Sequence, residues 1–170
     1  MRRLGWRWPL AVVAVAGLLV AIEALSAGSG SGGPAGRRAP PLPREALTGH
    51  PVTLATLRGG RAVINFWASW CSPCRKEAPE LARLARELPD DARLVGVNWN
   101  DNAASARRFA RRSGWRFPNL RDADGTVGNA YGLTGLPTTF VLDRELRIAA
   151  TLRGPQTAAS LRRALAEAAG

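Results

Sequence analysis

The stretch INFWASWCSPCRKEAPEL, residues 64–81, joins an apolar run to a segment with helical spacing, and the chain's only two cysteines lie at the junction. The apolar character of residues 62–67 predicts a buried central strand. Apolar side chains then recur on one helical stripe that should pack against this strand, namely Ala78, Leu81, Ala82, Ala85 and Leu88. Pro79 lies inside this helix, where it is expected to cause a kink. The sequence therefore predicts a strand-to-helix unit with Cys71 and Cys74 at its turn.

Redox chemistry explains the pair Cys71 and Cys74 better than a structural role does. A closed zinc site needs four ligands, whereas the chain has two thiols and a single histidine, His50, far from them in sequence. A structural disulfide between these cysteines would close a very short loop and restrict the unfolded chain little. We therefore predict thiol–disulfide exchange without a metal site, and we expect His50 on the surface.

The two cysteines are expected to have different roles in this exchange. Cys71 would begin a helix after a strand, where backbone N–H groups and the helix dipole stabilise a thiolate. Cys74, one helical turn further on the same side, can attack a mixed disulfide on Cys71 and release the product. Cys71 is thus the predicted nucleophile and Cys74 the predicted resolving thiol.

The positive charge of the chain does not indicate a nucleic-acid partner. The formal net charge is +11, but residues 1–41 hold five arginines against one glutamate, which leaves about +7 for the rest. Lys76 is the only lysine, so the arginine excess is typical of a biased composition rather than of a selected binding surface. The strongest basic cluster, ARRFARR at residues 106–112, is expected on a solvated helix face.

The first 25 residues have the pattern of an export signal. Three arginines, at positions 2, 3 and 7, precede an apolar run from Trp8 to Ile22. As a helix, residues 8–25 would span about 27 Å, close to the thickness of a bilayer core. We favour an uncleaved signal-anchor helix over residues 1–25 in the bacterial cytoplasmic membrane, with the body facing the periplasm or cell exterior. Small residues at Ala24 and Ser26 leave a cleaved signal peptide and a soluble exported protein as the alternative.

The remaining sequence predicts a tether and one α/β domain. Residues 26–41 are rich in Gly, Ser and Pro without hydrophobic periodicity, which is typical of a flexible linker. In residues 42–170 we expect an edge hairpin at 50–57, strands at 62–67, 92–99, 138–143 and 147–153, and helices after the cysteines and at 103–114, 124–132 and 157–169. This order indicates a three-layer α/β domain with a mixed sheet.

These residues resemble the thioredoxin superfamily and, within it, the exported, membrane-tethered thiol reductases grouped as TlpA, ResA and CcmG. The resemblance covers residues 47–168 and is carried by INFWASWCSPCRKEAPEL and by GLPTTFVLD at residues 135–143. Residues 98–132 also resemble the central insertion of that group. The resemblance implies a thioredoxin-like three-layer α/β/α sandwich and a redox disulfide between the two cysteines, with no cofactor.

The resemblance also implies how a substrate meets the cysteines. It implies that Leu136–Pro137 is a cis peptide bond facing them, with the adjacent backbone pairing with an extended substrate segment. The residues alone indicate only a sharp turn before a strand. Further substrate contacts are expected from Trp70, Ser72, Pro73 and Leu136. Trp67 would join Trp70 in an apolar platform, although a plain core position for Trp67 is an equal alternative.

The resemblance directs attention to two acids and one amide. Asn65 falls where ordinary thioredoxins carry a buried aspartate used in proton transfer, and asparagine cannot titrate. Glu77, one turn beyond Cys74 on the same helix face, matches a functional glutamate of ResA-like members and could accept the proton of Cys74. A solvated glutamate that complements the helix dipole is the alternative for Glu77. Glu80 is expected to point away from Cys74.

Several functions fit these residues. The leading hypothesis is an exported reductase of protein disulfides whose client, by resemblance, is apocytochrome c, with electrons supplied by a membrane partner of the CcdA or DsbD type. Thr138 follows the proline where CcmG proteins often carry glutamate, which weakens an assignment to the dedicated cytochrome branch. The alternatives are a general reductase for other clients such as copper-site proteins, an oxidase that forms disulfides, and a non-enzymatic Cu(I)-binding module.

Overall fold

The computed structural model describes residues 36–168. The predicted signal-anchor, residues 1–25, lies outside this range, and no helix within the range is long and apolar enough to cross a membrane. In chain order the elements are β1 (Glu45–Thr48), α2 (Leu54–Leu57), β2 (Arg61–Trp67), α3 (Ser72–Glu87), β3 (Ala92–Trp99), α4 (Ala103–Arg112), β4 (Asn119–Asp122), α5 (Thr126–Tyr131), β5 (Thr138–Leu142), β6 (Ile148–Arg153) and α6 (Ala158–Glu167).

The strands form one mixed sheet in the order β1-β4-β3-β2-β5-β6. The central strand β2 is parallel to β3 and antiparallel to β5, and β3 is parallel to β4. The parallel pairs are joined through α3 and α4, since parallel neighbours need a crossover connection. The edge strands β1 and β6 are antiparallel to their neighbours. The predicted mixed sheet is confirmed.

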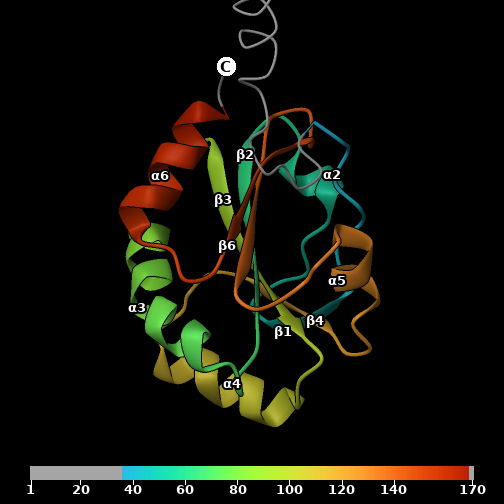
Figure 1. Ribbon diagram of the computed structural model, residues 1–170, viewed down its shortest axis with the longest axis vertical. Coiled ribbons are helices and arrows are strands. Elements are labelled where there is room, and N and C mark those ends of the chain that lie inside the picture. The colour runs from blue at the N-terminus through green and yellow to red at the C-terminus, as the bar shows by residue number, and fades with distance from the viewer. Residues whose placement is uncertain (1–35, 169–170) are drawn as a thin grey trace, which may run out of the picture. The chain divides into compact units, whose positions relative to one another are not determined.

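Alternating side chains of β2 build a core on each face of the sheet. Ala62, Ile64 and Phe66 belong to the core that includes residues of α2 and α5. Val63 belongs to the opposite core, with residues of α3 and α6, while Trp67 packs with residues of α4. Figure 1 shows α3 and α6 on one side of the strands and α2 and α5 on the other. These contacts confirm the predicted three-layer sandwich.

The hairpin expected at residues 50–57 is wrong, because residues 54–57 form the short helix α2. The hydroxyl of Thr53 accepts a hydrogen bond from the Thr56 amide, and the hydroxyl of Thr56 accepts one from the Thr53 amide. This reciprocal capping satisfies amides that open a helix, and it outweighs the weak alternation of polar and apolar residues. Only Leu57 of this helix is buried.

Two further strands and the linker differ from the expectation. Strands β1 and β4 were not predicted, because each has only four residues, too few for an alternation to appear. The expected linker ends earlier than residue 41, since residues 36–41 contact the folded body. The Ala39 amide donates to the Leu146 carbonyl, and the Ile148 amide donates to the Arg37 carbonyl. Hydrogen bonds to an edge strand need no hydrophobic periodicity, which explains why composition alone misplaced this boundary.

Candidate functional site

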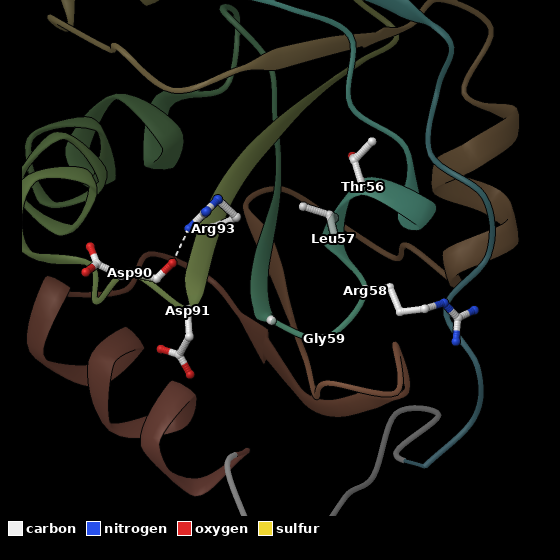
Figure 2. A pocket seen from close by; sticks show the side chains of 8 residues that line it. Thr56, Leu57, Arg58, Gly59, Asp90, Asp91 and Arg93 are labelled. Carbon is white, nitrogen blue, oxygen red and sulfur yellow. Dashed lines mark hydrogen bonds between the residues drawn. The ribbon is translucent and has the colours of Figure 1, made fainter.

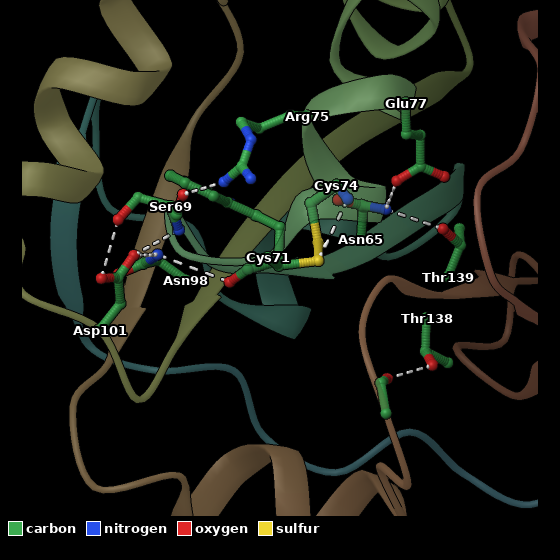
Figure 3. The surroundings of a disulfide bond; sticks show 12 residues. Asn65, Ser69, Cys71, Cys74, Arg75, Glu77, Asn98, Asp101, Thr138 and Thr139 are labelled. Carbon is green, nitrogen blue, oxygen red and sulfur yellow. Dashed lines mark hydrogen bonds between the residues drawn. A yellow bond between two sulfur atoms is a disulfide. The ribbon is translucent and has the colours of Figure 1, made fainter.

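Cys71 and Cys74 are joined by a disulfide at the start of α3, as Figure 3 shows. Their sulfurs are 2.06 Å apart and their Cα atoms 5.3 Å apart. Cys71 is the N-cap residue of α3, and its sulfur accepts a hydrogen bond from the Cys74 amide at 3.1 Å. Both cysteines are buried, with 4% of Cys71 and 1% of Cys74 exposed. The helix N-terminus therefore faces the sulfur of Cys71, which favours negative charge on that atom.

A groove of about 450 Å³ lies beside Cys71 and is closed on its far side by the loop before β5. The Leu136–Pro137 bond in this loop is cis, and Leu136 lines the groove together with Trp70, Ser72 and Pro73. Trp70 is 56% exposed. The structure thus brings the predicted substrate-contact residues to one concave surface, and a large apolar side chain is exposed there.

Trp99 is a groove residue that the sequence did not single out. Its ring centroid lies 6.4 Å from that of Trp70, in a tilted arrangement typical of aromatic pairs. Trp99 is the last residue of β3, the neighbour of the central strand. A tryptophan at the carboxyl end of that strand was the signal from which its place in the groove could have been predicted. Trp67, by contrast, is fully buried and donates through Nε1 to Asn119 Oδ1 at 3.0 Å. Trp67 is therefore a core residue and no part of the groove.

Glu77 is buried, and both oxygens of its carboxylate accept hydrogen bonds. One carboxylate oxygen accepts from the side-chain amide of Asn65 at 3.0 Å, and the other accepts from the backbone amide of Gln156 at 2.9 Å. The same Asn65 nitrogen also donates to Thr139 Oγ1 at 2.9 Å. Only 1% of Glu77 is exposed. The alternative of a solvated glutamate is therefore wrong.

Burial gives the Glu77 carboxyl an unusual acidity. It raises the pKa of Glu77 from 4.5 to about 7, against the opposing hydrogen bonds from Gln156 and Asn65. A carboxyl with a pKa near neutrality can both accept and donate a proton under physiological conditions. Glu80, as expected, takes no part in this network and instead accepts from the Ala158 amide at the start of α6.

The loop before Cys71 is held by the turn that follows β3. The carboxylate of Asp101 accepts from the Ser69 amide at 2.6 Å and from the Ser69 hydroxyl at 3.0 Å. The indole Nε1 of Trp70 donates to the Asn100 carbonyl at 3.2 Å. These residues could not be predicted from the sequence, because an Asn-Asp-Asn turn is an ordinary helix start and gives no sign of its partner 32 residues earlier.

A second hollow, of about 190 Å³, lies at the end of the sheet where β2 and β3 begin, away from the cysteines (Figure 2). Among its charged side chains, Asp91 pairs with Arg61 and Arg144, and Arg93 donates to the Asp90 carbonyl. The hydrogen bond from Arg61 lowers the pKa of Asp91. This hollow contains none of the predicted site residues, and His50 is exposed elsewhere as expected.

Residues 36–168 contain no group of three or more His, Cys, Asp or Glu side chains arranged to hold a metal ion.

Comparison with known proteins assigns this arrangement to a family. The sequence model of the AhpC/TSA family matches residues 35–151. The chain belongs to the AhpC/TSA family. It is 40% identical over 126 residues to the thiol:disulfide interchange protein HelX of Rhodobacter capsulatus, covering 72% of this chain and 70% of HelX. It is 32% identical over 123 residues to the thiol-disulfide oxidoreductase ResA of Bacillus subtilis, covering 72% of this chain and 69% of ResA.

A solved structure agrees with these AhpC/TSA relatives. A DsbF homologue from Corynebacterium diphtheriae superposes with a TM-score of 0.69 at 30% identity, covering 76% of this chain and 85% of that one. The thioredoxin-like fold and the resemblance to the TlpA, ResA and CcmG group are thereby confirmed. This AhpC/TSA member is a thiol–disulfide oxidoreductase of the ResA type.

Proposed function

We propose that the protein is an exported reductase that transfers electrons from Cys71 and Cys74 to a disulfide in another protein. The observation that supports this most strongly is the position of the pair. Cys71 opens α3 beside an apolar groove, and Cys74 lies one turn deeper on the same helix as the buried Glu77. An attacking thiol that lines the groove and a second thiol deeper in the helix suit the two steps of thiol–disulfide exchange.

In the proposed reaction the reduced protein begins with both thiols free. The thiolate of Cys71 attacks one sulfur of the client disulfide, forming a mixed disulfide and releasing the other client sulfur as a thiolate. Cys74 then loses its proton and attacks the sulfur of Cys71, which releases the second client sulfur. Two electrons have passed to the client, whose two thiolates take up protons from the surroundings, and Cys71 and Cys74 have become the disulfide that the structure contains.

Glu77 is the proposed acceptor for the proton of Cys74. Asn65 is buried on β2, opposite Thr139 of β5, but it carries no titratable group, so it cannot serve as the base. It can orient one, because its amide donates to the Glu77 carboxylate. With a pKa of about 7, Glu77 has the acidity of an efficient proton acceptor near neutral pH.

The proposed substrate segment binds in an extended form along the groove. Trp70, Ser72, Pro73 and Leu136 line the groove together with Cys71, and the cis bond to Pro137 follows Leu136. The Pro137 carbonyl accepts from the Gly154 amide and the Gly135 carbonyl from the Thr138 hydroxyl, so the pairing is proposed for the backbone of Leu136. The segment would thus present its disulfide to Cys71 from the open side of the groove.

The proposed client is the heme-binding CxxCH segment of apocytochrome c, kept reduced for heme attachment, and the proposed electron donor is a membrane protein of the CcdA or DsbD type. Support comes from the resemblance to the TlpA, ResA and CcmG group, which the ResA and HelX relatives strengthen. Residues 1–25 are proposed to anchor the protein in the cytoplasmic membrane, with residues 26–35 as the tether to the folded body.

Trapping the client in cells tests this proposal. In the full-length Cys74→Ser variant the mixed disulfide on Cys71 cannot be resolved, so the client stays attached and can be identified by mass spectrometry. We expect partners with CxxCH segments. The matched control is Cys71→Ser, which lacks the attacking thiol and should capture none of them. Capture of partners that lack CxxCH would support the general reductase for other clients, and the cytochrome assignment would fail.

A further inference from the structure

The carboxylate of Asp101 is surrounded by hydrogen-bond donors only. Its Oδ1 atom accepts from the Ser69 hydroxyl at 3.0 Å and from the Asn102 amide at 2.7 Å. Its Oδ2 atom accepts from the Ser69 amide at 2.6 Å and from Asn98 Nδ2 at 3.0 Å. Four donors around one side chain require a group that accepts at both oxygens, and a carboxylate does so where an amide cannot.

Two of these four donors belong to Ser69, two residues before the attacking cysteine. The next residue, Trp70, is tied to the same turn, because its indole donates to the carbonyl of Asn100. Asn100 has a φ of 45°, a left-handed conformation that asparagine tolerates better than most residues. The turn of residues 100–102 therefore holds both Ser69 and Trp70, which form the approach to Cys71. Figure 3 shows Asp101 facing Ser69 and Asn98 on the side of the disulfide away from Glu77.

The turn itself is fixed from behind. The Asn100 amide donates to the Asp122 carbonyl at the end of β4. The carboxylate of Asp122 in turn accepts from the Val127 and Gly128 amides in the first turns of α5. Hydrogen bonds thus connect the groove wall at Trp70 to the segment between β3 and β5, so α3 is not the only element that fixes the position of this wall.

We propose that Asp101 is a positioning residue for client docking. Its carboxylate holds the backbone of Ser69 so that Trp70 stands over the groove in the orientation that a client segment meets. Asp101 does not touch the sulfurs, so it acts through Trp70 rather than on the chemistry of Cys71. This inference rests on the attack by Cys71 proposed above and is independent of which protein is the natural client.

The conservative variant Asp101→Asn tests the role. It keeps the size of the side chain but replaces one accepting oxygen with an NH2 group, so the backbone amide of either Ser69 or Asn102 loses its acceptor. In the full-length protein we expect the second-order rate constant for insulin reduction to fall about 10-fold, because misplaced substrate contacts are costly. The reaction of Cys71 with the small disulfide DTNB needs no docked segment and should change by less than about 2-fold.

The control is Asp143→Asn. Asp143 also caps a turn, accepting from the Glu145 and Arg147 amides, but it lies at the end of β5 far from the cysteines. It should leave both rates unchanged. The Ser69→Ala variant, which retains the backbone bond, should reduce the insulin rate by a smaller factor, and it serves if Asp101→Asn does not fold.

Two outcomes separate positioning from a general structural effect. Hydrogen exchange at the Ser69 amide should become at least about 10-fold faster in Asp101→Asn than in Asp143→Asn. In a Trp70→Ala background, Asp101→Asn should lower the insulin rate by less than about 2-fold, since the residue through which it acts is gone. Equal losses for insulin and DTNB, an unchanged insulin rate, or full additivity with Trp70→Ala would overturn the inference. A wild-type protein that reduces insulin but no CxxCH peptide would instead refute only the proposed client.

Discussion

The side-chain amide nitrogen of Asn65 lies 3.0 Å from a carboxylate oxygen of Glu77, and both residues are buried. An amide thus stands where an acid could have titrated, and it donates a hydrogen bond to an acid on the neighbouring helix. In this pair, the Asn65 amide orients the carboxylate, and Glu77 is the group that titrates.

The Glu77→Gln variant should slow the resolution step near neutral pH. In this variant no carboxylate accepts the proton of Cys74, and loss of general base catalysis lowers the rate by about 10²-fold or more. The rate of release from a mixed disulfide on Cys71, followed by stopped flow between pH 5 and 9, should lose its inflection near pH 7. Glu80→Gln on the same helix is the matched control and should keep the wild-type profile. An unchanged profile in Glu77→Gln would exclude Glu77 as the base.

The stability of the oxidised protein should depend on pH through Glu77. Because burial raises its folded pKa from 4.5 to about 7, the folded state binds more protons in this window, and stability is lost as pH rises from 4.5 to 7. The shift corresponds to about 3 kcal/mol. We expect the free energy of unfolding, measured with urea, to fall between pH 4 and pH 8 by about 3 kcal/mol more in wild type than in Glu77→Gln. Parallel curves for the two proteins would contradict the raised pKa.

The Asn65→Asp variant should place two carboxyls at hydrogen-bond distance in a buried site. Ionising both carboxyls would place two negative charges close together, which costs free energy. The pair should therefore keep one shared proton to a pH above 7. We expect the variant to be markedly less stable than wild type at pH 8 and close to it at pH 5. A carboxyl stretch in the infrared spectrum that persists above pH 8 would report the shared proton. A loss of stability that is equal at both pH values would argue against this coupling.

Gly96 should not tolerate a methyl group. A Cβ at this position would lie 2.0 Å from Asn119 Oδ1 and 2.9 Å from Trp67 Nε1, the two atoms of a buried hydrogen bond. Gly96→Ala should therefore lower the free energy of unfolding by about 2 to 4 kcal/mol in a urea titration. Gly135→Ala, where a Cβ meets nothing within 4 Å, is the control and should unfold near the wild-type midpoint.

The sequence predicted the elements whose signal is local and missed those whose partner is distant. The central strand and the cysteine helix were predictable because apolar spacing and the helix start lie within residues 62–88. Strand β4 and helix α2 were not, since four-residue elements carry too few positions for a period to appear. The capping pair Thr53 and Thr56 was a readable signal that the alternation of the same residues obscured.

The site shows the same limit. The spacing of Cys71 and Cys74 indicated their chemistry, and Glu77 was located by its place on the helix and by resemblance. The partners of Glu77 and of Ser69 come from segments 79 and 32 residues away, at Gln156 and Asp101. Such contacts depend on strand order and loop packing, which a single sequence does not specify. The Thr139 contact with Asn65 likewise follows from the register of β2 against β5.

The midpoint potential of the Cys71–Cys74 pair tests the central claim most directly. Equilibrating the full-length protein in redox buffers and counting free thiols gives this potential without assuming any client. A reductase requires a potential well below about −200 mV, and this is the result we predict. A potential near −120 mV would contradict the proposed direction and identify the protein as an oxidase that forms disulfides.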